Sequence, residues 1–238
     1  KFKDKIKYIV IDKEPDGIVE ENNNPTLQRA NSLKRIELSY DEHFNAIKDD
    51  DDDDFIMLSD NDEIPNLDSE DFKKNKNDIV IFNQLFFYFK FNLLYDRMLW
   101  PGTKGCRKKN LKSFSWLRNI KFKKYPIWRI DTYFSNTKYS NLNIINDGGW
   151  HFTNLKSPED MFEKFMNFGH HDEFKLSGIT VDKIRDKISK REMFYDHFAD
   201  KSSKNKWDSD YKLKKIDTDL LPRYLVSNRE KYLEWFDL

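Results

Sequence analysis

Three carboxylates lie within four residues of the segment Ser59 to Pro65, which reads Ser-Asp-Asn-Asp-Glu-Ile-Pro. The apolar run Phe55 to Ser59 before them predicts a buried strand, and ligands of open α/β sheets bind beyond the carboxyl ends of strands. Asp60 and Asp62 flank a single residue, so their oxygens can face one divalent cation that neutralises a diphosphate. This Asp-x-Asp pattern predicts a metal site at Asp60 and Asp62. The alternative is a solvated turn with a helix-capping aspartate.

A second polar segment runs from Asp147 to His151 and contains two adjacent glycines. His151 can complete the metal shell or contact a pyrophosphate, and a core histidine that donates to the backbone is the alternative. Gly148 and Gly149 let the backbone approach a ligand closely, although a tight turn explains them equally. Trp150 can stack on a sugar face or fill the core. Asp147 is a candidate for a catalytic base.

Two further positions carry side chains suited to a site for a phosphorylated ligand. Arg29 can pair with phosphate or with other groups of a nucleotide, or it can be a surface helix arginine. His171 and Glu173 follow a predicted helix, where Glu173 is a candidate base or acceptor ligand. A surface salt bridge is the competing account of Glu173.

The stretch Lys104 to Lys124 interleaves basic residues with aromatic ones. This pattern also describes proteins that bind single-stranded nucleic acid. The chain as a whole has 42 basic and 42 acidic residues, so no net field attracts nucleic acid. A solvated face is the favoured interpretation, with Lys104, Arg107 or Arg118 reaching donor phosphates from a loop.

Strands and helices alternate along the chain, which favours an α/β fold. The predicted strands are Lys5 to Asp12, Phe55 to Ser59, Ile79 to Phe82, Gln84 to Leu94 and Leu142 to Ile145. The predicted helices are Pro25 to Leu38, Pro158 to Phe168, Val181 to Ile188 and Arg229 to Trp235. Six consecutive aspartates, Asp49 to Asp54, predict a solvated connection rather than a calcium site, since no glycine turn or alternating ligand pattern accompanies them.

The composition fits one domain over residues 1–238, because 238 residues with 38% hydrophobic content can bury a core. Cys106 is the only cysteine, and no apolar run approaches the ~20 residues of a membrane span. We therefore expect a reducing, cytoplasmic location.

Several separated motifs resemble glycosyltransferase family 17, whose animal members add the bisecting N-acetylglucosamine to N-glycans. The matching segments, in order, are Gln28 to Asn31, Ser59 to Pro65, Trp100 to Gly102, Gly148 to Phe152, His171 to Glu173, and Leu221-Pro222 with Asn228. They extend over nearly the whole chain.

The resemblance implies a GT-A fold, a Rossmann-like sheet, and an inverting, metal-dependent transfer of N-acetylglucosamine from UDP to a glycan or glycoprotein acceptor. Mn²⁺ or Mg²⁺ would be held by Asp62, by Asp60 directly or through water, and by His151. Family members begin with a further strand and a glutamate-containing loop, so we expect the first strand to be missing and the chain to be truncated at its N-terminus. A microbial or viral relative is expected, with a Golgi location only if an unseen anchor exists.

Two other functions remain open from the sequence. One is a non-catalytic protein that binds carbohydrate or nucleotide sugar with the transferase fold. The other is a nucleic-acid-binding module using Lys104 to Lys124, which ranks far below.

Overall fold

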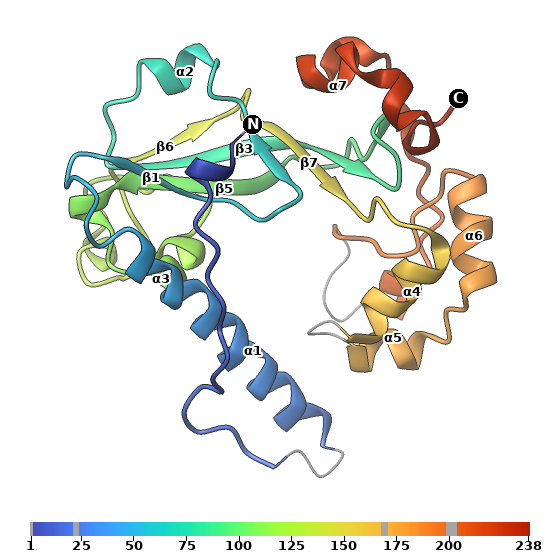
Figure 1. Cartoon of the computed structure of the whole chain (residues 1–238), viewed down its shortest axis with the longest axis horizontal. Coiled ribbons are helices and arrows are strands. Elements are labelled where there is room, and N and C mark those ends of the chain that lie inside the picture. The colour runs from blue at the N-terminus through green and yellow to red at the C-terminus, as the bar shows by residue number, and fades with distance from the viewer. Residues whose placement is uncertain (1, 21–23, 168–170, 199–203) are drawn as a thin grey trace. The chain divides into compact units, whose positions relative to one another are not determined.

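The computed structural model describes residues 2–20, 24–167, 171–198 and 204–238 (Figure 1). The chain forms two compact units. The first comprises Lys1–Leu58, Lys76–Ile81 and Lys104–Ile144, and the second comprises Ser59–Asn75, Phe82–Thr103 and Ile145–Leu238. The single domain expected from composition thus corresponds to a chain with two compact units, each with its own apolar core.

The sheet is mixed, which confirms the α/β class. Its strands are β1 (Phe55–Leu58), β2 (Glu63–Pro65), β3 (Ile79–Tyr88), β4 (Leu93–Leu94), β5 (Trp100–Arg107), β6 (Leu142–Ile145), β7 (Gly149–Thr153) and β8 (Lys214–Lys215). The order is β1-β5-β3-β4-β8, with β6 and β7 also paired to β3, and β2 paired to β7. The β3–β7 pair is parallel, whereas β1–β5 and β2–β7 are antiparallel.

Strand β3 is central because its sequence is apolar on both faces. Nine of its ten residues are buried, which is typical of a strand covered on both sides. Asn83 lies within this strand, so the two separate strands predicted for this region, Ile79 to Phe82 and Gln84 to Leu94, were wrong. The strand ends where Phe89 adopts a φ of 68°, and only Leu93–Leu94 of the remainder pairs again.

In the first unit, helix α1 (Pro25–Glu42) confirms the helix predicted from Pro25. The Asn24 side chain accepts hydrogen bonds from the backbone nitrogens of Thr26 and Leu27, at 3.0 and 3.4 Å, and so caps the helix. Helix α3 (Phe114–Asn119) lies in the predicted basic stretch. The core of this unit gathers residues from α3, β3, β5 and β6: Ile79, Ile81, Cys106, Leu111, Phe114, Leu117, Ile120 and Leu142.

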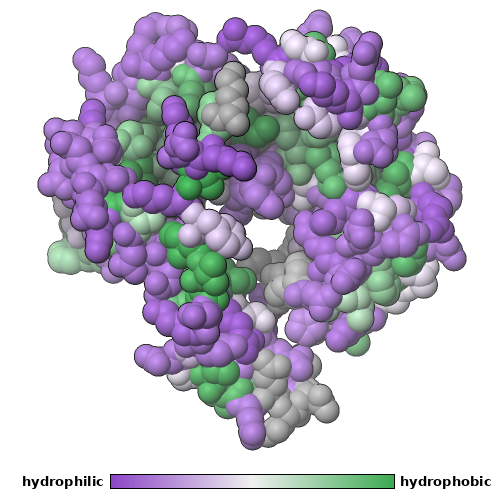
Figure 2. Space-filling view, viewed as in Figure 1, coloured by the Kyte–Doolittle hydropathy of each residue, from purple (hydrophilic) through white to green (hydrophobic). Residues whose placement is uncertain are grey.

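The segment predicted as the strand Lys5 to Asp12 is not a strand. A 3₁₀ turn occupies Lys3–Lys5, and most of the residues that follow it, up to Asp12, are exposed. A strand exists through hydrogen bonds to a neighbour, and among the described residues none pairs with this segment. Figure 2 shows hydrophobic residues at the surface over the N-terminal segment and α1, where Ile6, Val10 and Leu33 are exposed.

The strand predicted over Phe55 to Ser59 forms as β1, but all four of its residues are only half-buried. The expectation of a buried strand was wrong because β1 is the edge of the sheet and pairs with β5 alone. Asp51 to Asp54 are exposed, which confirms the solvated connection for that part of the aspartate run.

The second unit contains five α-helices among its described residues: α2 (Glu70–Lys73), α4 (Pro158–Asn167), α5 (His171–Ser177), α6 (Val181–Ser189) and α7 (Arg223–Ser227). Helix α4 contacts both α5 and α6 (Figure 1). The helices predicted from Pro158 and Val181 are confirmed, although Phe168 lies outside the described residues. The predicted closing helix, Arg229–Trp235, is a 3₁₀ helix with a kink at Tyr232.

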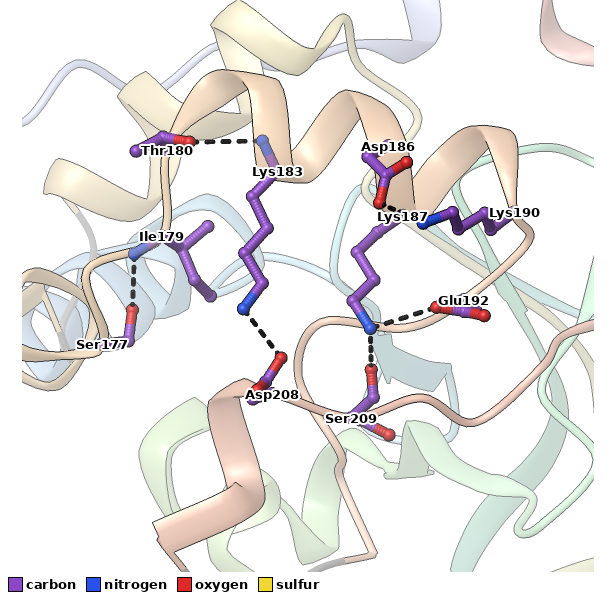
Figure 3. A network of polar contacts seen from close by, with 10 residues as sticks. All are labelled: Ser177, Ile179, Thr180, Lys183, Asp186, Lys187, Lys190, Glu192, Asp208 and Ser209. Carbon is purple, nitrogen blue, oxygen red and sulfur yellow. Dashed lines mark hydrogen bonds and ion pairs between the residues drawn. The ribbon is translucent and has the colours of Figure 1, made fainter.

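Polar contacts join α6 to the chain that follows it (Figure 3). The Thr180 hydroxyl caps the helix by accepting from the Lys183 nitrogen at 3.2 Å. Lys187 is buried, and its Nζ donates to Glu192 at 3.1 Å and to the Ser209 carbonyl at 2.7 Å. A buried ammonium needs such partners. Lys187 therefore connects α6 to the segments that contain Glu192 and Ser209.

Within the described residues, no helix has the combination of length and apolar character that crossing a membrane requires.

Candidate functional site

The carboxylate motif forms a tight turn between β1 and β2. The Glu63 nitrogen donates to the Asp60 carbonyl at 3.1 Å, which closes the turn, and β2 then pairs with β7 so that Glu63 lies opposite His151. The Phe152 nitrogen donates to the Asp62 carbonyl at 2.8 Å. The two segments predicted from the sequence, Ser59 to Pro65 and Asp147 to His151, therefore lie side by side in the second unit.

Asp62 and His151 are brought together, as the metal prediction requires. The His151 Nε2 lies 3.5 Å from the Asp62 Oδ2. The imidazole is buried, and its ring is stacked with the rings of Phe86 and Trp100, at centroid distances of 4.8 and 4.5 Å. Its Nδ1 is buried and has no hydrogen-bond partner among the described residues. Contacts with both rings restrict the rotation of the imidazole, whose Nε2 lies toward Asp62.

The charges around Asp62 determine its protonation. Burial pushes the pKa of Asp62 up, but the hydrogen bond and charge of His151, together with the charge of Lys164, outweigh burial and lower the pKa below 3.8. Burial lowers the pKa of Lys164, and the charge of Asp62 partly opposes this effect. Asp62 is therefore an anion at neutral pH, positioned to attract a cation.

Glu63, the next residue, has a different environment. Its Oε1 accepts from the Trp100 indole nitrogen at 2.8 Å, and its Oε2 accepts from the Asp60 nitrogen at 3.3 Å and the Thr103 hydroxyl at 3.4 Å. Burial raises the pKa of Glu63 despite the Trp100 hydrogen bond. Because every oxygen of this carboxylate already has a partner, Glu63 holds the turn in place.

A cavity of about 530 Å³ lies beside Asp62, within the second unit. It is lined by Asn61, Asp62, Ile64, Phe91, Phe152, Asn154, Leu155, Lys156 and Lys164. This volume falls in the range of small-molecule sites, roughly 300–1,000 Å³. The lining carries two ammonium groups and one carboxylate, so the cavity favours an anionic ligand.

The sequence analysis missed Asn154, Lys156 and Lys164 as site residues. Asn154 is buried with a φ of 56°, and its Oδ1 accepts from the Lys164 Nζ at 2.9 Å. An asparagine tolerates this left-handed conformation better than most residues. One sequence signal for Lys164 exists: it follows the buried Met161 by three residues on α4 and so shares a helix face with it.

Gly148 and Gly149 lie where other backbone segments approach. A Cβ at Gly148 would collide with the backbone of Asn83, and a Cβ at Gly149, where φ is 105°, would collide with the Ile64 carbonyl. These two glycines are therefore required by the close approach of β7 to its neighbouring segments. Their predicted contact with a ligand remains a prediction.

Trp150 and Asp147 point to other partners. Trp150 packs against the apolar cluster that includes Phe87 and Leu221, and its indole nitrogen donates to the Leu220 carbonyl. Asp147 is exposed and accepts from the Asn66 amide at 2.9 Å. Neither is among the residues that line the cavity, so their predicted roles in sugar stacking and base catalysis gain no support from geometry.

The remaining predicted residues are dispersed. Arg29 is exposed on α1 of the first unit. Glu173 lies on α5 and forms an ion pair with Lys206 at 3.1 Å, so the alternative of a salt bridge is confirmed, although Lys206 is only 12% exposed and the pair is not at the surface. Asp60 takes part in the turn through its backbone, and like Glu173 it does not line the described cavity.

The residues present fit a divalent cation only in part. Among the described residues, no three His, Cys, Asp or Glu side chains converge on one point. Asp62 and His151 offer two ligand atoms 3.5 Å apart, a separation compatible with two ligands that are each about 2.1 Å from one ion. Substrate phosphate oxygens and water would have to complete the shell, as is common for Mg²⁺.

Comparisons of the chain with protein-family models, with curated proteins and with solved structures find no match. The resemblance to family 17 therefore stays a prediction from the motifs themselves.

Proposed function

We propose that this protein transfers a sugar, N-acetylglucosamine first among the candidates, from a UDP donor to a carbohydrate acceptor with inversion, on a GT-A-like fold. One observation carries the proposal: the ionised Asp62, oriented by His151, lies on the wall of a 530 Å³ cavity that also presents two lysines. The family resemblance of the motif around Asp62 supports the same conclusion.

The cavity lining suits a nucleotide sugar. Lys156 and Lys164 offer two positive charges to a diphosphate, and Asn61 and Asn154 offer amides to hydroxyl groups. Phe91 and Phe152 supply aromatic surface for an apolar sugar face or a base. A mixture of apolar walls and a few polar groups is the usual composition of a site that orients a small ligand.

In the proposed mechanism, Lys164 and Lys156 stabilise the charge that grows on the departing diphosphate. His151 holds the Asp62 carboxylate in one orientation, and the Trp100 and Phe86 rings hold His151. A Mn²⁺ or Mg²⁺ ion held by Asp62 and by His151, whose Nε2 would then give up its hydrogen bond to the carboxylate, would add Lewis-acid stabilisation of the same leaving group. An acceptor hydroxyl attacks the anomeric carbon, and a carboxylate takes its proton, for which Asp147 and Glu173 remain the sequence-based candidates.

A donor screen tests the proposal. Release of the nucleoside diphosphate would be measured with UDP-N-acetylglucosamine, UDP-glucose and a GDP-sugar, with and without Mn²⁺. We expect turnover of a UDP-sugar that Mn²⁺ accelerates. Preference for the GDP-sugar would refute the proposal.

The second candidate function is binding without turnover. It is favoured by one observation, namely that neither sequence-based base candidate lines the described cavity. UDP binding accompanied by no release from any UDP-sugar, at any metal concentration, would assign this second function.

A further inference from the structure

Five large apolar side chains are exposed in the loop formed by residues 126–134 of the first unit. Each is at least 70% exposed: Ile127, Trp128, Ile130, Tyr133 and Phe134. Single exposed apolar residues are ordinary on protein surfaces. Five within eight residues form a patch, and such patches mark surfaces that meet a protein, a ligand or a membrane.

The loop has a defined conformation that keeps these side chains outward. Thr132 is buried, and its hydroxyl donates to the Arg129 carbonyl at 2.7 Å. The Tyr133 hydroxyl donates to the Ile127 carbonyl at 3.0 Å, which closes the loop on itself. Tyr125 is buried at the base of the loop, with the Arg129 guanidinium over its ring at 5.2 Å. Polar and aromatic contacts thus hold the base while the apolar tip stays in water.

The charge around the loop is strongly positive in a chain whose total charge is zero. Residues 121–138 contain five basic side chains and one acidic one, Asp131. That aspartate forms ion pairs with Arg129 at 2.6 Å and Lys138 at 2.8 Å. Lys121, Lys123 and Lys124 are exposed. The patch therefore combines an apolar tip with a basic flank.

We propose that the 126–134 loop docks on the interfacial layer of an anionic lipid membrane. Tryptophan, tyrosine and phenylalanine favour the headgroup boundary, and isoleucine side chains gain by entering the acyl region. Each lysine near an anionic surface adds electrostatic attraction to it. The loop inserts its tip, and the lysine flank contacts lipid phosphates and carboxylates.

Two other occupants fit the patch less well. Single-stranded nucleic acid binds by stacking on aromatic rings, and Ile127 and Ile130 cannot stack. A second copy of this chain, joined through a two-fold axis, would bring two identical basic flanks face to face. Like charges so placed repel, whereas an anionic membrane attracts them.

Sedimentation with lipid vesicles tests the inference. The whole chain would be mixed with vesicles of phosphatidylcholine alone and of phosphatidylcholine with phosphatidylserine. We expect binding to the second kind only, weakened at high salt. The double variant Trp128→Ser/Phe134→Ser should bind at least about tenfold more weakly, because both rings lose the free energy that they gain by leaving water.

The matched control is Leu176→Ser, because Leu176 is also highly exposed but lies on α5 of the second unit. This control should bind vesicles as the unaltered chain does. Absence of binding to the anionic vesicles, or an equal loss in the control, would overturn the inference. A self-association in solution that the double variant abolishes, without vesicle binding by the unaltered chain, would assign the patch to a second copy instead.

Discussion

Charged side chains usually lie in water and apolar side chains usually lie inside a protein. The turn Asp60 to Glu63 departs from the first rule, and the loop 126–134 departs from the second. The turn withdraws carboxylates from water and surrounds them with an imidazole, an indole and hydroxyl groups. The loop places isoleucine and aromatic side chains in water. Both arrangements cost free energy in folding, because buried carboxylates lose hydration and exposed apolar surface gains nothing.

The two regions differ in how many of their side chains have partners within the protein. The polar groups of the turn have partners within the protein, and only the Asp62 carboxylate also faces a cavity. Only the base of the loop 126–134 has partners within the protein. Each region therefore has one surface that no other part of the protein covers, and the chemistry of that surface favours one kind of ligand. The turn favours an anionic ligand that binds together with a cation. The loop favours an amphipathic ligand that carries anionic groups.

The largest effect is expected from Asp62→Asn, which keeps the side-chain volume and removes the charge. Removing a group that stabilises a leaving group typically costs a hundredfold or more in rate, about 3 kcal/mol. Stability should change by about 1 kcal/mol or less. Sugar transfer and melting temperature would be measured on the same preparation, at saturating Mn²⁺.

The control for this substitution is Asp219→Asn, at an exposed carboxylate of the second unit that lies outside the cavity. It should leave transfer unchanged. Retained transfer with a lowered melting temperature in Asp62→Asn would show instead that the turn is only a scaffold.

A second substitution tests whether a buried charge in the second unit can be purely structural. Lys187→Met breaks an ion pair whose side chains are 10% and 18% exposed, and leaves Glu192 buried without its cation. We expect a loss of about 3 kcal/mol in the free energy of unfolding. Lys190→Met, which breaks an exposed pair with Asp186 on the same helix, should cost about 0.5 kcal/mol. Equal losses in urea unfolding would contradict this distinction.

The two neighbouring carboxylates should respond to pH with opposite sign. The pKa of Glu63 is raised above 4.5 in the folded state, so its protonated form favours folding. This contribution to stability is lost as the pH rises through the raised pKa. The pKa of Asp62 is lowered below 3.8, so its contribution is present above that value and is lost as pH falls through its folded pKa. Glu63→Gln should therefore gain stability relative to the unaltered chain between about pH 4 and pH 8. Denaturant unfolding at both pH values measures the difference, and a relative loss would argue against the burial effect.

Local signals in the sequence predicted three helices, those that begin at Pro25, Pro158 and Val181. The helix from Pro25 follows a capping asparagine, and α6 follows Thr180, whose hydroxyl caps it. Caps and helical periodicity depend on residues three or four apart, so the sequence contains them directly. The strand predicted from Lys5 failed because a strand depends on a partner elsewhere in the chain.

The candidate site was predicted by residue type but not by contact. Asp62 and His151 were both named from their motifs, and their approach follows from the pairing of β2 with β7, which no local pattern specifies. Glu63 was not distinguished from its neighbours, because its role depends on Trp100 and Thr103 from a distant strand. Lys164 resembles a surface lysine in sequence, and only the packing of α4 directs it to Asn154.

The smallest effect on stability is expected at the loop. Trp128→Ser/Phe134→Ser should change the free energy of unfolding by less than about 0.5 kcal/mol, because both side chains are already in water. Thermal and denaturant unfolding provide the measurement. A clear destabilisation would mean that the rings pack within the protein in solution, and the contrast between loop and turn would then disappear.

Calorimetric titration of UDP into the whole chain, with Mn²⁺ and then with a chelator, tests most directly whether the cavity beside Asp62 binds a nucleotide through a cation. Asp62 and His151 would hold the ion, and the ion and the two lysines would bind the diphosphate. We predict that Mn²⁺ strengthens UDP binding, that the chelator reverses the gain, and that Asp62→Asn abolishes it. Equal UDP affinity with and without Mn²⁺ would contradict the account.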